Sequence, residues 1–365
     1  EIIEKDKEPY IKKIGIERLH MEEDAGKLVH SGSDRLAGSK YSLVDYNRAG
    51  IALCEIVSKP DIRSGKEASE YASEIRRTVR YLGVSDGNMQ EGSLRCDVNI
   101  SVRKGPNAPF GTKVEIKNMN SFSAIQKACD YEIARQIEVY ENGGKIFQET
   151  RLWDEAKQLT KSMRLKEGSS DYRYFPDPDL GPIEITKAQQ EIWFKELPEL
   201  PSKKRNKYVS QFGLSAYDAR VISDEISMAN FFEETVANGA EAKLASNWVT
   251  SDIVGYLKSN KLSFSELQLS PKNLAEMINM ISKNIISGKI AKEILPELIQ
   301  KNISPKKLVE EKGLAMISDS SSILPIIDEL INEHPNEVQA FKNGKTKLLG
   351  FFVGQLMKRT KGKAD

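Results

Sequence analysis

The sequence predicts an α+β fold, in which a mainly antiparallel β-sheet domain with helices precedes an all-α helical domain and a small helical tail. Alternating apolar and polar residues mark strands in the first half, and two capped helical stretches lie among them. From Ala188 onward the apolar residues recur almost wholly at helical spacing. We therefore predict domains over residues 1–197, 198–300 and 301–365, the soft boundary between the last two falling around residues 296–310.

The strands are predicted from alternation. Residues 10–21 read as an extended stretch with one slip in phase, and residues 93–103 alternate more cleanly. In residues 111–117, Val114 and Ile116 alternate with charged residues. Because successive side chains of a strand point to opposite faces, such segments predict a sheet with one apolar and one polar face. Short strands are predicted to continue through Phe175.

The helices are predicted from their ends. One begins near Ser64 and stops at Gly83, and the other begins near Ser121 and stops at Gly143. Serine caps the free amides of a first turn, and glycine readily adopts the left-handed conformation that ends a helix. In the second half, loop residues punctuate the helical pattern at Pro198, Pro201, Gly213, Gly239, Pro271 and Pro305.

Composition narrows the class of protein. The 365 residues are 39% hydrophobic and 29% charged, which is typical of a soluble globular chain, and no apolar run approaches the ~18 residues of a membrane span. Lys+Arg (54) and Asp+Glu (53) nearly cancel, so nucleic-acid contacts must come from local patches. Three widely spaced cysteines argue against a zinc site or a disulfide framework. They favour a reducing compartment, and we predict the cytoplasm or an organelle matrix.

Two groups of carboxylates are candidate metal or phosphate sites. Residues 20–27 hold Glu22, Glu23 and Asp24 beside a glycine, and oxygen ligands of this kind suit Mg²⁺; a solvated acidic turn is the alternative. If residues 93–103 and 111–117 share one sheet, its polar face presents carboxylates and cations together. These residues are Arg95, Asp97, Glu115 and Lys117. Such a face suits Mg²⁺ plus phosphate, although an exposed salt-bridge ladder has the same pattern.

The chain ends in a basic run. Its last 25 residues include Lys342, Lys345, Lys347, Lys358, Arg359, Lys361 and Lys363 against one Asp. A run of this kind suits contact with a phosphate backbone, and a solvated tail is the alternative.

Five blocks resemble the B subunits of the aspartyl/glutamyl-tRNA(Asn/Gln) amidotransferases. They are residues 14–27 (IGIERLHMEEDAGK), 45–50 with 55–57, 91–99 (EGSLRCDVN), 113–118 with 120–122, and 171–176 (DYRYFP). They occur in the family's order and are followed by a helical half, so the resemblance covers essentially the whole chain. In one departure, Ala52, Leu53 and Cys54 stand where the family usually has Pro, Leu and an aliphatic residue.

The resemblance implies an ATP-dependent carbon–nitrogen ligase that works in a heterotrimer. Its partners are an amidase-like A subunit, which releases ammonia from glutamine, and a small C subunit. With ATP and Mg²⁺ the B subunit phosphorylates the side-chain carboxylate of Glu-tRNA(Gln) or Asp-tRNA(Asn), and channelled ammonia then displaces phosphate. Because the chain opens on Glu1, inside the family sequence, we expect a catalytic cradle domain incomplete at its N-terminus and inactive alone.

The resemblance also implies roles for individual residues. Glu23 matches a metal ligand, and Asp97 and Glu115 match acidic positions for metal or nucleotide contact. Arg95 and Lys117 are expected to contact phosphate or carboxylate. From the basic run in an otherwise neutral chain, we expect the helical half to bind the tRNA body while the sheet receives the acceptor end. The residues expected to contact RNA are Lys345, Lys347, Lys358, Arg359, Lys361 and Lys363.

Two rival interpretations remain. One is a non-catalytic tRNA-docking scaffold, in which the acidic faces are structural and only the helical half functions. The other is the related Glu-specific subunit, which carries an inserted synthetase-like domain. Phe175 is followed too soon by the helical half to leave room for that insertion.

Overall fold

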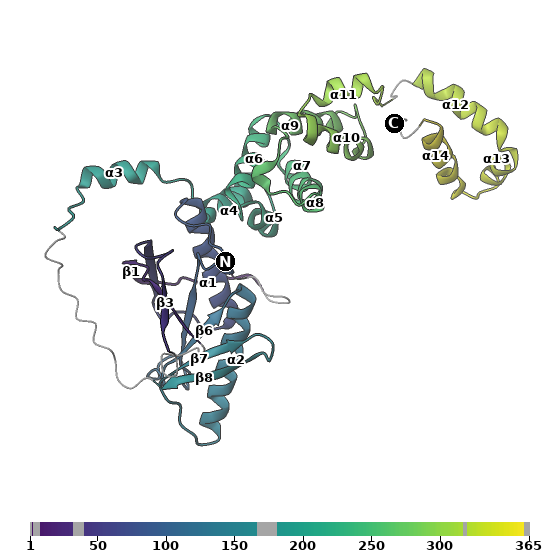
Figure 1. Cartoon of the computed structure of the whole chain (residues 1–365). Helices are drawn as coiled ribbons and strands as arrows, with labels where there is room; N and C mark the ends of the chain where they lie inside the picture. The colour runs from purple at the N-terminus through teal and green to yellow at the C-terminus, as the bar shows by residue number, and fades with distance from the viewer. Residues whose placement is uncertain (1, 3–7, 32–39, 166–180, 317–319, 361–365) are drawn as a thin grey trace. The chain divides into compact units, whose positions relative to one another are not determined.

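The computed structural model describes the chain except for residues 1, 3–7, 32–39, 166–180, 317–319 and 361–365. The chain divides into two compact units, residues 1–79 with 85–185, and residues 80–84 with 186–365 (Figure 1). The first unit holds the strands and two long helices, and the second is helical. This arrangement confirms the predicted α+β class. The predicted boundaries at residues 197 and 300 stay predictions.

The first unit contains two antiparallel ribbons and one larger sheet. Strand β1 (Ile16–Glu23) pairs with β4 (Ala52–Ser58), and β2 (Lys27–His30) pairs with β3 (Ser42–Asp45). The larger sheet has the order β5–β6–β7–β8. Its strands are Cys96–Ile100, Val114–Met119, Glu149–Asp154 and Leu159–Leu165. Of the predicted short strands, β7 ends at Asp154 and β8 at Leu165, and residues 166–175 lie outside the described residues.

One strand pair of the larger sheet is parallel. Strands β5 and β6 are antiparallel, as are β7 and β8, whereas β6 and β7 run in the same direction. Parallel neighbours need a crossover connection, and helix α2 (Phe122–Glu141) supplies it. The sheet is thus mainly antiparallel, as predicted.

Both helices predicted in this half are confirmed. Helix α1 spans Gly65–Tyr81, and Gly83 follows it with a φ of +67°. Helix α2 begins after Ser121, whose hydroxyl accepts a hydrogen bond from the Ala124 amide at 3.1 Å. These ends use the cap chemistry that the sequence indicated.

The predicted alternation in β6 positions the site. Val114 and Ile116 are 0% exposed, and Ile116 packs in a core with Ile125 of α2 and Trp153 of β7. The polar residues that alternate with them, Glu115 and Lys117, therefore point to the opposite face. One face of the sheet thus joins the core, and the other carries charge.

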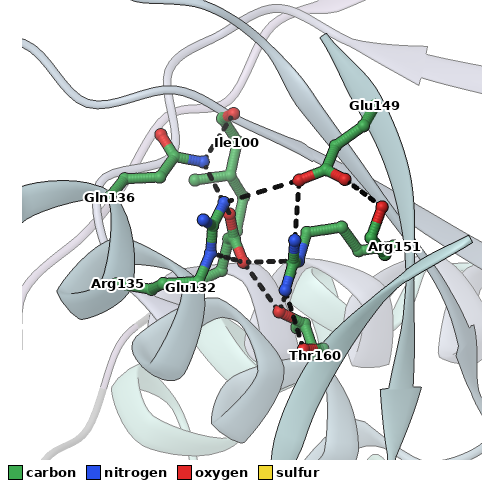
Figure 2. Close-up of polar contacts among 8 residues, drawn as sticks. Ile100, Glu132, Arg135, Gln136, Glu149, Arg151 and Thr160 are labelled. Carbon is green, nitrogen blue, oxygen red and sulfur yellow. Dashed lines mark hydrogen bonds and ion pairs between the residues drawn. The ribbon is translucent and has the colours of Figure 1, made fainter. Parts of the chain in front are cut away.

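A buried ionic network fastens α2 to β7 and β8. Glu132 of α2 is 0% exposed and receives hydrogen bonds from Arg135 (3.0 and 2.5 Å) and from the Thr160 hydroxyl (2.9 Å). Arg151 of β7 lies 3.6 Å from Glu132 and 2.6 Å from Glu149 (Figure 2). Burial opposes ionisation of Glu149, but hydrogen bonds from Ser162 and Arg151 outweigh it and lower its pKa. Buried charges persist only when paired in this way.

The second unit is a helical array. Its helices are α3 (Lys187–Glu196), α4 (Pro201–Ser210), α5 (Ala216–Ile222), α6 (Ile226–Ala237), α7 (Ala242–Asn247), a π-helical turn (Trp248–Ile253), α8 (Val254–Ser259), a 3₁₀ turn (Phe264–Glu266), α9 (Pro271–Ser282), α10 (Gly288–Lys301), α11 (Pro305–Glu311), α12 (Ser320–Glu333), α13 (Pro335–Lys342) and α14 (Leu348–Arg359). The core of α4–α11 includes Phe232, Ile253 and Leu298, all 0% exposed. Among the described residues, no helix is long and apolar enough to cross a membrane.

Candidate active site

A triad of charged residues lies on the polar face of the sheet. The ammonium of Lys117 (β6) makes a very short contact with the Asp97 carboxylate of β5 and lies 3.6 Å from Glu115 Oε1. Asp97 is half exposed, whereas the Glu115 side chain is only 15% exposed. The structure therefore brings together three of the four residues that the sequence placed on this face.

Lys117 faces Asp97 across the β5–β6 pair, next to a β-bulge. The register of β5 and β6 shifts between Cys96, opposite Met119, and Val98, opposite Ile116. Lys117 and Asn118 therefore oppose the single residue Asp97. Asn118 has a φ of +70°, a left-handed conformation that Asn tolerates better than most residues, and its side-chain Nδ2 donates to the Trp153 carbonyl at 3.2 Å. The register that pairs Asn99 with Glu115 sets Lys117 opposite Asp97, and the bulge inserts Asn118 directly after it.

Lys117 remains a cation in this setting. Partial burial lowers its pKa, but the hydrogen bond and charge of Asp97, together with Glu115, outweigh that effect and raise the pKa above its ordinary value. Beside it, burial and the Asp97 charge raise the pKa of the Cys96 thiol to about 11. The face thus holds a Lys117 ammonium that stays protonated at neutral pH, beside the Asp97 and Glu115 side chains.

A second charged group surrounds Asp24, directly after β1. Its carboxylate forms ion pairs with two arginines: Arg48 Nε lies 2.9 Å away and Arg95 Nη2 lies 3.5 Å away. The backbone fixes Asp24 from both sides, since its amide donates to the Ile51 carbonyl (2.8 Å) and its carbonyl accepts from the Gly50 amide (2.9 Å). Arg95, predicted to join the sheet-face group, instead lies beside Asp24. Two guanidinium groups on one carboxylate leave a local excess of positive charge, which suits a phosphate or carboxylate ligand.

Glu23 occupies the exposed end of β1, opposite Ala52 of β4. Within the described ranges, no group of three or more His, Cys, Asp or Glu side chains is placed to hold a metal ion. The roles predicted for Glu23, Asp97 and Glu115 in metal or nucleotide contact stay predictions. The Asp97 and Glu115 carboxylates nevertheless both face the Lys117 ammonium, and both offer only oxygen atoms as ligands.

The structure describes only part of the predicted RNA-binding run. Lys345 and Lys347 lie exposed before α14, and Lys358 lies exposed in its last turn. Arg359 forms ion pairs with Glu329 (3.1 Å) and Glu333 of α12, so these carboxylates partly neutralise its guanidinium. Lys361 and Lys363 lie outside the described residues.

Sequence reasoning missed three residues of this region. Arg48 lies within residues 45–50, one of the blocks of resemblance, but nothing in its spacing pointed to Asp24. Asn118, whose backbone is left-handed, directly follows Lys117. The presence of an Asn near the end of a strand is the one sequence feature that indicates this conformation. Thr150 is 0% exposed, and its hydroxyl donates to Glu115 Oε2 at 2.9 Å. Alternation in residues 149–154 is too weak to single it out.

Comparison with known proteins matches both halves of the chain. The family model for the GatB/GatE catalytic domain matches residues 2–191, and that for the GatB domain matches residues 230–365. The B subunit of the aspartyl/glutamyl-tRNA(Asn/Gln) amidotransferase from Prochlorococcus marinus (strain AS9601) is 99% identical over all 365 residues, which span 74% of its length. Proteins of the same name from strain MIT 9312 and from Parasynechococcus marenigrum (strain WH8102) are 94% and 70% identical over the same span.

A domain of the GatB/GatE catalytic type, followed by a GatB domain, places the chain in the amidotransferase class. Within that class, the chain belongs to the family of aspartyl/glutamyl-tRNA(Asn/Gln) amidotransferase B subunits. This membership confirms the resemblance on which the sequence analysis relied.

Proposed function

We propose that this chain activates the side-chain carboxylate of Glu on tRNA(Gln), or of Asp on tRNA(Asn), for conversion to the amide. Family membership over both halves of the chain supports the transamidation role. The observation that carries the assignment to a site is the Lys117 ammonium placed between Asp97 and Glu115. The partners are an amidase-like A subunit that supplies ammonia from glutamine and a small C subunit.

The reaction proceeds in two balanced steps. A side-chain carboxylate oxygen of the aminoacyl group attacks the γ-phosphorus of ATP, and the bond to the ADP oxygen breaks. The nitrogen of ammonia then attacks the carbonyl carbon of the acyl phosphate, the bond from that carbon to the phosphate oxygen breaks, and the nitrogen gives up one proton, so that the amide forms and phosphate leaves with the proton. Activation is needed because a free carboxylate is a poor acyl donor. The first step brings two anions together, so its barrier falls when fixed positive charge faces them.

Three basic side chains supply that charge. Lys117 remains protonated at neutral pH and is held by Asp97, ready to offset charge on a transferring phosphoryl group. The Arg48 and Arg95 guanidinium groups, oriented by Asp24, are placed to bind a phosphate or the substrate carboxylate.

The carboxylates fit a magnesium ion. Mg²⁺ is usually held by one or two protein carboxylates together with water and substrate phosphates, and Asp97 and Glu115 would be those two. When bound, the ion would neutralise charge on the phosphate oxygens. Glu23 is proposed as a further ligand.

A reconstituted assay tests this function. The complete enzyme, containing this chain and its partner subunits, is mixed with misacylated Glu-tRNA, glutamine, Mg²⁺ and γ-labelled ATP. ATP cleavage should require the misacylated tRNA and should be lost in Glu23→Ala and Asp97→Ala. If cleavage and amide formation survive both substitutions while tRNA binding falls, the acidic residues serve docking, and the scaffold interpretation holds.

A further inference from the structure

We propose that Thr150 is a positioning residue whose hydroxyl holds the Glu115 carboxylate in the orientation that faces Lys117. The inference rests on the proposed function, because it gives Glu115 a role in the reaction. Thr150 itself is fully buried beside Glu115 and touches no reacting atom in the proposal. It would act on turnover only through Glu115.

The contact is direct and occurs across paired strands. Glu115 and Thr150 are register partners in the parallel pair β6–β7. Thr150 Oγ1 donates to Glu115 Oε2 at 2.9 Å, while Oε1 of the same carboxylate lies 3.6 Å from Lys117 Nζ. The two carboxylate oxygens thus have different neighbours. The last torsion of a glutamate is intrinsically broad, so a fixed donor on one oxygen determines where the other points.

Thr150 can serve as a fixed donor because its strand is held from both sides. Successive residues of β7 face opposite ways, and Arg151 joins the buried network with Glu132 and Thr160 (Figure 2). Two residues further on, the Trp153 carbonyl accepts from Asn118, the residue that forms the bulge beside Lys117. Strand β7 therefore supports both members of the Lys117–Glu115 pair.

The side-chain type fits this role. Threonine is β-branched, so its first torsion has few options, and complete burial restricts it further. A hydroxyl offers one donor, which a carboxylate accepts more strongly than a neutral oxygen does. Valine has nearly the same shape without the donor, whereas serine retains the donor in a smaller side chain. These two substitutions separate hydrogen bonding from packing.

The test measures tRNA-dependent ATP cleavage and amide formation by the complete enzyme carrying Thr150→Val, Thr150→Ser or Glu115→Gln. Thr150→Val should lower kcat about tenfold, equivalent to about 1.4 kcal/mol of barrier, with the KM for misacylated tRNA unchanged. Thr150→Ser should recover most of the loss. In a Glu115→Gln background, Thr150→Val should add almost nothing, because the group on which it acts has lost its charge.

Thr160→Val is the matched control. Thr160 is also buried in this sheet, and its hydroxyl also contacts a glutamate, but that glutamate is Glu132 on the opposite face. Thr160→Val should lower the melting temperature more than Thr150→Val does, yet leave kcat near the wild-type value. If Thr150→Val does not accumulate as folded protein, Thr150→Ala removes the same hydroxyl with less crowding.

The outcomes separate the two claims. Wild-type turnover in Glu115→Gln would overturn the site assignment in the proposed function, and the role of Thr150 with it. An inactive Glu115→Gln beside a Thr150→Val enzyme of wild-type kcat would overturn the positioning role alone. So would a Thr150→Val defect that Thr150→Ser does not recover, or an equal loss of kcat in Thr160→Val.

Discussion

Replacement of Glu132 by alanine tests how the sheet is fastened to α2. The side chain is 0% exposed, and its carboxylate has Arg135, Gln136 and Thr160 within hydrogen-bond distance. Arg151 adds an ion pair at 3.6 Å. Alanine removes every one of these contacts and leaves two guanidinium groups in a poorly hydrated setting, since the Arg135 and Arg151 side chains are 20% and 13% exposed.

The size of the effect follows from what remains. Removing one partner of a buried ion pair costs roughly 3–5 kcal/mol because the other charge is left uncompensated. Here Glu149 still pairs with Arg151 at 2.6 Å and lies 4.0 Å from Arg135. We therefore expect the lower end, about 3 kcal/mol, for Glu132→Ala. Glu132→Gln keeps a polar side chain of the same shape and should cost about 1–2 kcal/mol.

Hydrogen exchange in increasing urea, read by mass spectrometry, measures this locally. Amides of β7, β8 and α2 should lose protection by the predicted amount, while those of α6 and α9 serve as an internal reference. The matched variant is Glu297→Ala. Like Glu132, Glu297 pairs with two basic side chains, here Lys301 and Lys312, but it does so at the surface, where such pairs contribute little to stability. A loss below about 1 kcal/mol in Glu132→Ala, or an equal loss in the reference helices, would refute the reasoning.

Three further predictions concern pH, thiol reactivity and RNA. Because the pKa of Glu149 is lowered in the folded protein, its carboxylate stabilises the fold above the unfolded pKa of about 4.3, and this stabilisation is lost as the pH falls through the folded pKa. Glu149→Gln should therefore make the protection of the β7 amides less sensitive to acid. Exposed Cys54 should react with iodoacetamide at pH 8 well before Cys96, whose pKa of about 11 keeps it protonated, and peptide mapping reads this out. Joint Lys347→Glu and Lys358→Glu substitution should weaken tRNA binding and flatten its salt dependence in filter-binding assays, and unchanged binding would remove these lysines from the RNA contact.

Local sequence signals predicted much of the fold. Ser121 and Gly143 mark the two ends of α2, which the sequence could indicate because helix caps act on adjacent residues. The alternation at residues 114–117 correctly divided β6 into a buried and a charged face. Lys117, Asp97 and Glu115 come together because antiparallel β5 and β6 place them on that same face.

Contacts over long sequence distances could not be predicted in this way. The parallel pairing that places Thr150 beside Glu115, and the approach of Arg95 to Asp24, depend on tertiary structure. The sequence does contain an indication that Glu132 is buried, because it lies on the same face of the helix as Ile125 and Cys129. Helical spacing alone does not reveal that buried arginines from another strand compensate its charge.

The transfer of oxygen tests the central claim most directly. The complete enzyme is given Glu-tRNA(Gln) whose side-chain carboxylate carries ¹⁸O, together with ATP, Mg²⁺ and glutamine, and the released phosphate is analysed by mass spectrometry. If the carboxylate is phosphorylated, one labelled oxygen leaves with each phosphate as the amide forms. Label-free phosphate accompanied by amide formation would contradict the activation that we assign to this chain.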